Sequence, residues 1–425
     1  MGEDAPPVSV VGRGQPLEAR LRAAGLPPLP RSAWLEIDVT ALAANVATIR
    51  SLLEPGVRLA AVVKADAYGH GLVPTVRALV GAGVECLCVA TLDEALAVAD
   101  VATGVPILAL FQPPADGMCE AAARGIEVTL SAEGTIAELA RLGLPPDRPL
   151  HVHLEIDSGL GRAGVTAERA AAVAEGLREI PGVRLVGVWT HLASAHDASA
   201  SAEQASRFAR AAEALEAAGA RGVLRHICAT GGVLGRTAPR YDMVRIGLAL
   251  YGLLPEAFPV APDARAAAAR LRPAMSLRAR PLRVADVQPG EGVGYGARWR
   301  ADRPSRVATL PVGYGDGWAY ASAGRTSALV RGRRVPLIGS VAMDAVAADV
   351  TDVPGVGLGD EFVLLGEQGG ERITALDLAR ERATIPWEII TAMARRLPRV
   401  YDSDGHVLSV RTLSGEARGS GSGGT

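Results

Sequence analysis

A lysine stands at the end of a run of small apolar residues near the start of the chain. The stretch AVVKADAYGHG, residues 61–71, places Lys64 directly after a segment with the composition of a buried strand. A lysine beside apolar surface has a lowered pKa, so its neutral amine can attack an aldehyde and form a Schiff base. This pattern favours a site for pyridoxal 5'-phosphate. A solvated lysine at a strand end is the alternative that spacing alone leaves open.

Other polar side chains follow later apolar runs of the same kind. The carboxyl ends of parallel strands lie at one edge of the sheet, so residues placed there can share a site. One lysine, one histidine and two arginines beside a glycine-rich turn are typical of a site for a phosphate-bearing cofactor. Taken alone, an arginine in such a place would more simply be half of a surface ion pair. The residues are Arg162, His191, Thr230 and Arg245.

Eight short β-branched or apolar runs alternate with alanine-rich helical patterns. Strands that alternate with helices predict a parallel sheet, and eight of them predict a closed (β/α)₈ barrel. An open doubly wound sheet is the alternative, because periodicity does not show closure. The gap before the last run is short, so its helix is doubtful. The runs are at 57–64, 85–91, 105–110, 126–131, 150–157, 185–192, 224–230 and 242–246.

After about residue 265 the pattern changes to closely spaced strand-like runs with Gly- and Pro-rich turns. We therefore expect an α/β protein in which a TIM-type (β/α)₈ barrel is followed by a C-terminal mostly-β domain. The strand-like AWLEI at 33–37 precedes the barrel and can pair with the second domain instead. The expected parts are a flexible N-terminal arm at 1–30, the barrel at 33–265, the β domain at 266–410 and a disordered tail at 411–425.

Charge and composition argue against several other classes of protein. The formal net charge is -2, which argues against a general binder of nucleic acid or anionic membranes. No apolar run approaches ~18 residues and the acidic start is no signal peptide, so we expect a cytoplasmic protein. His151 and His153 alternate on a strand without a third ligand nearby, and His226 likewise lacks a partner, so we expect core histidines and no metal. GLGRAG at 159–164 matches a dinucleotide fingerprint but lacks the acidic residue at the end of the next strand.

The stretch around Lys64 resembles the cofactor-lysine motif of the alanine racemase family. The resemblance extends from about residue 33 to 401 through seven ordered motifs. It implies a (β/α)₈ barrel with a C-terminal β domain, pyridoxal 5'-phosphate as cofactor, and a head-to-tail homodimer. It also implies a racemase that interconverts L-alanine and D-alanine. The motifs are AVVKADAYGHG, LEIDSGLGRAGV, WTHLASA, YDMVRIGLALYG, GVGYGARW, PVGYGDGW and GSVAMDA.

The resemblance implies two catalytic residues, one for each face of the cofactor. Lys64 would bind the cofactor and act as one acid/base, and Tyr295, reaching in from the partner subunit, would act as the other. Two bases on opposite faces can remove and return the α-proton without turning the substrate. A tyrosine has an ordinary pKa of about 10, so it needs cationic neighbours to act as a base, and His191 and Arg245 could supply them.

The resemblance also implies the contacts of the cofactor and the substrate. Arg245 would face the pyridine nitrogen, where an arginine discourages protonation and so disfavours transamination. His191 would be linked to the catalytic tyrosine and stacked near the cofactor ring. The phosphate positions match Tyr68, Thr230, Gly247 and Leu248, and the substrate-carboxylate positions match Arg162, Tyr314 and the backbone of Met343.

The chain departs from the family pattern at four positions. Glu155 stands where the family often has a carbamylated lysine, and its carboxylate could hold Arg162 directly. Thr230 keeps a hydroxyl where the family has an Asn-Ser pair, and Ser340 replaces a common arginine. Trp387 replaces a tyrosine whose hydroxyl reaches the cofactor phosphate, and its N–H is only a donor. A racemase of other or broader amino acids therefore stays open, as do a non-catalytic pyridoxal-phosphate carrier and a decarboxylase of the related fold.

Overall fold

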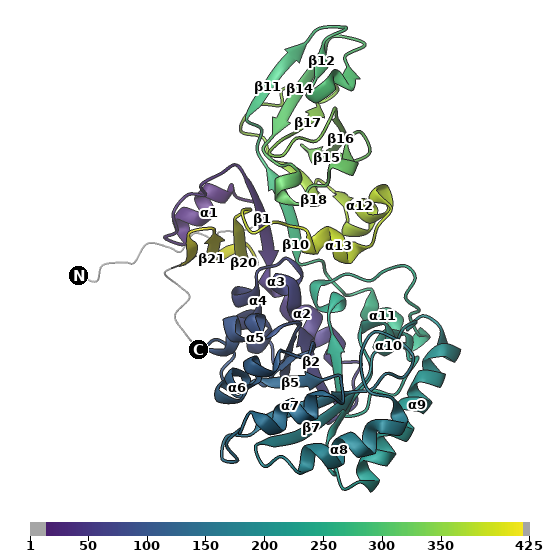
Figure 1. The fold of residues 1–425 in the computed structure, drawn as a ribbon. Coiled ribbons are helices and arrows are strands. Elements are labelled where there is room, and N and C mark those ends of the chain that lie inside the picture. Colours follow the sequence, from purple (N-terminus) through teal and green to yellow (C-terminus); the bar gives the residue numbers. More distant parts are fainter. Residues whose placement is uncertain (1–13, 420–425) are drawn as a thin grey trace, which may run out of the picture. The chain divides into compact units, whose positions relative to one another are not determined.

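The computed structural model describes residues 14–419. They fold into two compact units, which are coloured along the sequence in Figure 1. One unit holds residues 41–68 and 72–272. The other holds the described residues up to Thr40, a three-residue segment at 69–71 and the chain from Pro273 onward.

Eight parallel strands form the sheet of the first unit, with β8 and β9 at its two ends. Backbone N–H groups of Asp242 and Arg245 donate to the carbonyls of Arg225 and Cys228 at 3.0 and 2.9 Å, so the end strands meet and the barrel is nearly closed. The prediction of a (β/α)₈ barrel is confirmed. The strands are β2 (Arg58–Val62), β3 (Cys86–Val89), β4 (Ile107–Ala109), β5 (Glu127–Leu130), β6 (Leu150–Glu155), β7 (Val183–Trp189), β8 (Leu224–His226) and β9 (Met243–Ile246).

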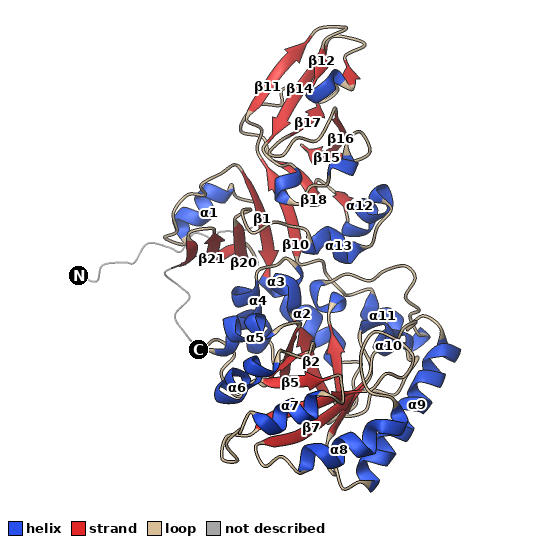
Figure 2. Ribbon diagram, in the orientation of Figure 1, coloured by secondary structure: helices blue, strands red, loops and turns tan. Residues whose placement is uncertain are grey.

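Helices connect these strands and lie outside them, as Figure 2 shows in blue and red. The helix that the short gap made doubtful is present as six residues, α10 (Thr230–Gly235). The barrel strands are rich in apolar residues, and all four residues of β3 are buried, because helices cover one face and the barrel interior the other. The remaining helices are α2 (Val39–Arg50), α3 (Lys64–Tyr68), α4 (Leu72–Gly81), α5 (Leu92–Ala99), α6 (Ala115–Arg124), α7 (Thr135–Arg141), α8 (Ala170–Arg178), α9 (Ala198–Ala217) and α11 (Arg265–Ala268).

The second unit is built on a 12-stranded sheet with a separate two-stranded ribbon. Strand β1 (Ala33–Asp38) belongs to this sheet, antiparallel to β10 and parallel to β20, so AWLEI joins the β domain. The other strands are β10 (Met275–Ala279), β11 (Arg283–Val287), β12 (Gly292–Val293), β13 (Trp299–Arg300), β14 (Ser305–Leu310), β15 (Ser327–Val330), β16 (Arg333–Ile338), β17 (Val346–Asp349), β18 (Phe362–Gln368), β19 (Glu371–Ile373), β20 (Arg399–Ser403), β21 (His406–Thr412) and β22 (Gly415–Arg418), and the helices are α12 (Ala375–Arg382) and α13 (Pro386–Thr391).

The expected flexible arm and disordered tail do not hold for the described residues. Helix α1 (Leu17–Ala23) buries Leu17 and Leu21 in a cluster with Trp34 and Val400. Strands β21 and β22 pair with each other in the part expected as a tail. The two apolar residues of α1 lie among Pro, Gly and Arg residues, so the composition of this segment did not indicate a helix. Residues 1–13 and 420–425 lie outside the described residues.

Two further expectations concern membranes and metals. Between residues 14 and 419 no helix combines the length and apolar character needed to cross a bilayer. Within the same range no three His, Cys, Asp or Glu side chains gather as they would around a metal ion. Neither observation adds a function to those the sequence indicates.

Candidate active site

Lys64 follows strand β2 and begins the short segment α3. The backbone of Ala65, Asp66, Ala67 and Tyr68 has φ angles between 52° and 55°, so α3 is a left-handed turn and not a right-handed helix. Residues with side chains adopt this conformation at a cost of roughly 1–2 kcal/mol each. Such strain persists where the surroundings fix it, and it gathers at functional sites.

Carboxylates from neighbouring segments hold this turn. Glu94 Oε1 accepts the N–H of Ala65 at 2.7 Å, and Asp66 Oδ1 accepts the N–H of Leu72 at 2.8 Å. Glu94 also accepts the N–H of Ala90 at 2.8 Å, so one side chain joins the turn to the end of β3. These bonds hold the first residue of the strained segment, Ala65, and tie Asp66 within it to the start of α4 at Leu72, and so help to set the position of Lys64.

The environment of Lys64 suits a nucleophilic amine. Burial lowers the pKa of Lys64 below its ordinary value, and the positive charge of Arg162 lowers it further. A larger fraction of the side chain is then neutral at pH 7 and able to attack an aldehyde. Of the 44 lysine and arginine residues of the chain, Lys64 is the single lysine.

Tyr68 and Gly247 lie against each other in the same unit. The Tyr68 ring is buried and stacks on Tyr251 with ring centroids 4.8 Å apart, and the Tyr251 hydroxyl donates to the carbonyl of Val62 at 3.0 Å. A Cβ atom built at Gly247 would lie 2.5 Å from the Tyr68 hydroxyl oxygen. Glycine at this position therefore makes room for the hydroxyl.

Thr230 and Leu248 complete the group of expected phosphate contacts. Both residues are buried. The backbone N–H of Ala249 lies 3.5 Å from Thr230 Oγ1, so the start of α10 meets the segment that follows β9. Together with Tyr68 and Gly247, these residues offer hydroxyl and backbone N–H donors of the kind that bind phosphate.

We expect Gly247→Ala to raise the Kd for pyridoxal 5'-phosphate by roughly tenfold, because overpacking of about 1–3 kcal/mol would fall on the Tyr68 hydroxyl. Titration of the cofactor-free protein, followed by absorbance, measures this change. Gly81→Ala is the matched control, since nothing lies within 4 Å of a Cβ built there. An unchanged Kd for Gly247→Ala would contradict the assignment of this cradle to the phosphate.

Arg245 is a buried charge on strand β9. Nη1 donates to the carbonyl of His226 at 3.0 Å and to the ring Nδ1 of His226 at 2.7 Å, and Nη2 donates to the carbonyl of Thr190 at 2.8 Å. The guanidinium lies over the Trp189 ring, 4.7 Å from its centroid. Burial lowers the pKa of Arg245 to about 10, so the guanidinium is charged at neutral pH.

His191 lies beside Arg245 but does not carry a positive charge. Its Nδ1 is 3.4 Å from Nη2 of Arg245. Burial and then the charges of Arg245 and Arg162 lower the pKa of His191 to about 3. The imidazole is therefore neutral at pH 7, and the expectation that it could supply a cation for the catalytic tyrosine is wrong. Of the two neighbours proposed for that role, Arg245 alone is charged.

Glu155 and Arg162 form the ion pair that the sequence suggested. Arg162 Nη2 lies 3.4 Å from Glu155 Oε1, and the Ser131 hydroxyl donates to Glu155 Oε2 at 2.6 Å. Glu155 is buried at the end of β6, whereas 41% of the Arg162 side chain is exposed. The guanidinium also lies 5.6 Å from the centroid of the Phe111 ring. A glutamate thus holds Arg162 without a modified lysine.

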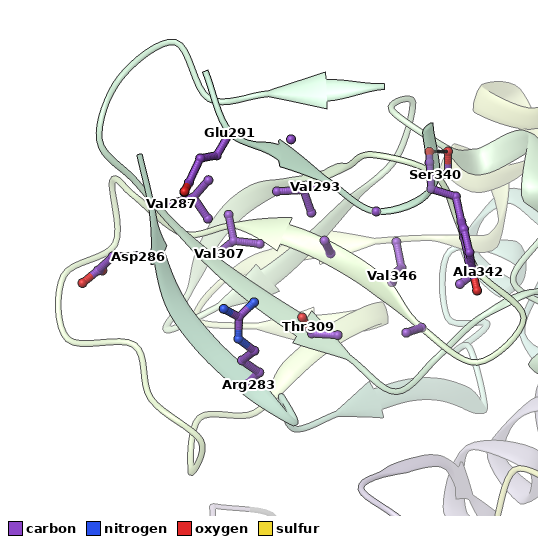
Figure 3. Close-up of a pocket in the computed structure, with 15 residues that line it drawn as sticks. Arg283, Asp286, Val287, Glu291, Val293, Val307, Thr309, Ser340, Ala342 and Val346 are labelled. Atoms are coloured by element: carbon purple, nitrogen blue, oxygen red, sulfur yellow. Dashed lines mark hydrogen bonds between the residues drawn. The ribbon is translucent and has the colours of Figure 1, made fainter. Parts of the chain in front are cut away.

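Tyr295 lies in the β domain and lines an open hollow of about 650 Å³. Figure 3 labels other residues of this lining, such as Ser340 and Val346. Tyr295 begins a single 3₁₀ turn, Tyr295–Ala297, and 76% of the residue is exposed. The hydroxyl of buried Ser340 donates to the Tyr295 carbonyl at 3.0 Å, as the dashed line in Figure 3 marks. Ser340, one of the departures from the family pattern, therefore anchors the backbone that carries Tyr295.

Tyr314 and Met343 lie together through backbone hydrogen bonds. Tyr314 N–H donates to Ala342 at 3.0 Å, and the Met343 carbonyl accepts from the Gly315 N–H at 2.9 Å and from Arg396 at 3.2 Å. A substrate carboxylate only accepts hydrogen bonds, so any contact with the Met343 backbone falls to its N–H. The loop that holds Tyr295 through Ser340 thus also carries Met343 and the partner of Tyr314.

Trp387 lies half-buried in the first turn of α13. Its carbonyl accepts from the Thr391 hydroxyl at 2.7 Å. The indole has a single donor and no acceptor, so it cannot repeat the hydrogen bonding of the tyrosine hydroxyl that the family has there. Trp387 therefore differs from the tyrosine of the family in the hydrogen bonds that it can form.

Three features of the site were missed in the sequence. Tyr251 lies in a quoted motif but received no role, although its ring supports Tyr68. His226 was read as lacking a partner, yet it contacts Arg245 and His153. The single lysine was visible in the composition and would have weakened the alternative of a chance surface lysine.

The fold and the site define a class before any relative is compared. A parallel barrel with a partly buried lysine after one strand and a buried arginine on another, followed by a mostly antiparallel β domain, is the architecture of fold type III pyridoxal-phosphate enzymes. Residues 37–255 match the family model "Alanine racemase, N-terminal domain", and residues 274–401 match "Alanine racemase, C-terminal domain". The chain belongs to the alanine racemase family.

Individual relatives support the same assignment. The chain is 37% identical over 381 residues to the alanine racemase of Desulfosudis oleivorans, covering 87% of this chain and 96% of the relative. Its fold is similar to the alanine racemase from Bacillus anthracis with bound L-Ala-P, with a TM-score of 0.84, 32% identity and 91% and 99% of the two chains covered. It is also similar to the alanine racemase from Bartonella henselae with covalently bound pyridoxal phosphate, with a TM-score of 0.76, 27% identity and coverage of 88% and 100%.

Proposed function

We propose that this protein is a pyridoxal-phosphate-dependent alanine racemase that interconverts L-alanine and D-alanine, with Lys64 and Tyr295 as its two acid/base residues. One observation carries the proposal above the others. The only lysine of the chain stands at the end of a barrel strand with a lowered pKa, in the same unit as the buried guanidinium of Arg245. This pair supplies the amine and the ring-nitrogen partner that the cofactor needs.

The residues present fit pyridoxal 5'-phosphate. Lys64 would bind its aldehyde, the cradle of Tyr68, Thr230, Gly247 and Leu248 its phosphate, and Arg245 its ring nitrogen. A side chain at Gly247 would fill the space beside Tyr68, which favours this reading of the cradle. When bound, the cofactor withdraws electrons from the α-carbon of the amino acid and so makes its proton removable.

Groups of the protein would orient the substrate and move its α-proton. Arg162, held by Glu155, together with Tyr314 and the Met343 N–H, would bind the substrate carboxylate and fix which bonds of the α-carbon face the two bases. Lys64 serves one face of the α-carbon and Tyr295 the other. Trp387 would border the substrate side chain, so the size of the accepted amino acid is the part of the proposal that it most affects.

We further infer that the working unit is a homodimer in which each chain supplies Tyr295 to the other. Tyr295 is largely exposed and lies beside an open hollow whose rim includes Arg283, Glu291 and Val307. A cation beside a phenol favours its ionised form, which is the form that acts as a base. A second copy of the chain would supply both a cover for Tyr295 and a cation such as Arg245.

Incubation of the cofactor-loaded protein with L-alanine in deuterated water tests the activity. Loss of the α-proton signal together with formation of D-alanine is the expected result. A cofactor absorbance band without exchange of the alanine proton would overturn alanine as the substrate. A panel of amino acids, tested with the wild type and with Trp387→Tyr, then measures how the indole alters the choice of side chain.

A further inference from the structure

Four side chains from four strands are linked inside the barrel by hydrogen bonds. Nη1 of Arg245 on β9 lies 2.7 Å from Nδ1 of His226 on β8. Nε2 of His226 lies 2.9 Å from Nδ1 of His153 on β6, and Nε2 of His153 lies 2.8 Å from Oε2 of Glu127 at the start of β5. Both histidines are fully buried, and 16% of the Glu127 side chain is exposed. The set is called the Glu127 chain below.

The chemistry of the two ends fixes the direction of every bond. A guanidinium only donates, so Nδ1 of His226 must accept and its Nε2 carries the proton. Nδ1 of His153 must then accept from His226, and its own Nε2–H donates to Glu127. An ionised carboxylate only accepts, so the far end agrees with the near end. Both histidines are therefore held as neutral Nε2–H tautomers.

The charges of the groups agree with this direction. Burial, followed by the charge of Arg245, lowers the pKa of His226 well below its ordinary value, so this imidazole is neutral. Burial alone would raise the pKa of Glu127, but its hydrogen bond to His153 and nearby positive charge, that of Arg58 included, outweigh that effect and lower it. Glu127 is an anion at neutral pH and Arg245 a cation.

Gly187 allows the Glu127 chain to cross a strand. Strand β7 lies between β6 and β8, and Gly187 is paired with His153 on one side and with Leu224 on the other. A Cβ atom at Gly187 would lie 2.1 Å from Nδ1 of His153. Any other residue at 187 would occupy the place of the imidazole, so glycine opens the route to His226.

Arg245 has no hydrogen-bonded carboxylate in the described part of the chain. Among residues 14–419 its hydrogen-bond partners are two imidazoles and the carbonyls of Thr190, His226 and Ile227, and none is a carboxylate. A buried cation without an anion is costly, and hydrogen-bonded imidazoles in a low-dielectric interior transmit polarisation. The charge of Glu155 favours the charged form of Arg245 without a bond to it, whereas Glu127 is the acid to which the hydrogen bonds lead.

We propose that Glu127, acting through His153 and His226, is the remote counter-charge of Arg245 and a positioning residue for the ring-nitrogen partner of the cofactor. The role of Arg245 toward the cofactor rests on the proposed function, whereas the hydrogen-bond order does not. With a carboxylate at its end the chain has one possible direction. With an amide, which can donate or accept, only Arg245 still imposes that direction, and the reversed order, in which Nδ1–H of His226 faces the N–H of Arg245 and releases it, competes with it.

Histidine tautomers test this order directly. The protein has seven histidines, so ¹⁵N-histidine labelling of the cofactor-loaded enzyme gives a tractable ring spectrum. We expect single Nε2–H tautomers for His153 and His226 in the wild type and in Glu127→Asp, and mixed tautomers in Glu127→Gln. An unchanged His226 signal in Glu127→Gln would overturn the proposal.

Product partition tests the consequence for the cofactor. We expect Glu127→Gln to lower kcat by about 10- to 100-fold, as removal of a partner that orients a site residue does, and to raise the yield of pyruvate per racemisation event. Pyruvate forms when the amino group of alanine stays on the cofactor, which a firmly held Arg245 disfavours. Glu127→Asp should restore most of the wild-type partition.

Glu85→Gln is the matched control, because Glu85 lies directly before barrel strand β3, much as Glu127 begins β5, and accepts the backbone N–H of Leu59 but is not part of the Glu127 chain. It should leave the His226 signal and the partition unchanged, and equal effects of Glu85→Gln and Glu127→Gln would refute the proposal.

Gly187→Ala should reproduce the Glu127→Gln spectrum by displacing His153. If the wild type forms no D-alanine the proposed function fails, while the tautomers still decide the order of the bonds.

Discussion

Lys64→Ala is expected to lower kcat/KM for alanine racemisation by roughly 10³-fold or more, because one residue supplies both the covalent anchor of the cofactor and one of the two bases. The variant would contain no lysine, so no other side-chain ammonium can take over either task. Arginine cannot replace it, since the guanidinium is protonated at all accessible pH values and has no free electron pair to attack an aldehyde.

Borohydride reduction of the cofactor-loaded protein, followed by peptide mass spectrometry, measures the anchor separately from the activity. The wild type should gain one reduced cofactor on the peptide that contains Lys64, and Lys64→Ala and Lys64→Arg should gain none there. Modification at the chain's amino group would appear on a different peptide. Racemisation of alanine at the wild-type rate by Lys64→Ala would refute the assigned mechanism.

Much of the barrel could be predicted because its signals are local. The barrel strands are short and rich in apolar residues, and Ala-rich helical patterns follow most of them, and these properties need no knowledge of distant residues. The closure of the ring did need such knowledge. It depends on the backbone hydrogen bonds of Asp242 with Arg225 of β8 and of Arg245 with Cys228, just beyond β8, which no periodicity shows.

The ends of the chain could not be predicted for the same reason. Leu17 and Leu21 are ordered because Trp34 and Val400 cover them, and the four residues are brought together by the fold alone. The Pro, Gly and Arg residues around Leu17 and Leu21 give this segment the composition of a flexible N-terminal arm, which is what the sequence indicated. Strand β22 is likewise ordered by its pairing with β21, although its residues have little apolar character.

Some features of the candidate site could likewise be predicted from local sequence, and others depend on distant residues. Lys64 and Arg245 stand at strand ends that the sequence located, so their placement on the barrel could be expected. The protonation of His191 could not, because it results from burial and from three cations that converge in space. The partnership of His153 with His226 depends on the missing side chain of Gly187, a residue on a third strand.

Tyr295→Phe is expected to lower kcat for racemisation by about 10²- to 10⁴-fold, the range for loss of a general acid or base. Phenylalanine keeps the ring and removes only the hydroxyl that would move the proton. Cofactor binding and its linkage to Lys64 should be unchanged. Exchange of the α-proton with deuterated water should persist for one enantiomer of alanine and be lost for the other, because Lys64 still serves its own face.

Mixed dimers decide which chain supplies the tyrosine. If Tyr295 acts in the partner's site, a dimer of one Lys64→Ala chain and one Tyr295→Phe chain contains one site with both defects and one with neither. Mixing the two inactive variants, unfolding them and refolding them together should then restore activity, whereas each variant refolded alone should stay inactive. If Tyr295 acted within its own chain, every site of the mixture would keep one defect and no activity would return. Recovery in the mixture would therefore establish both the dimer and the exchange of the base, which the exposed position of Tyr295 leads us to expect.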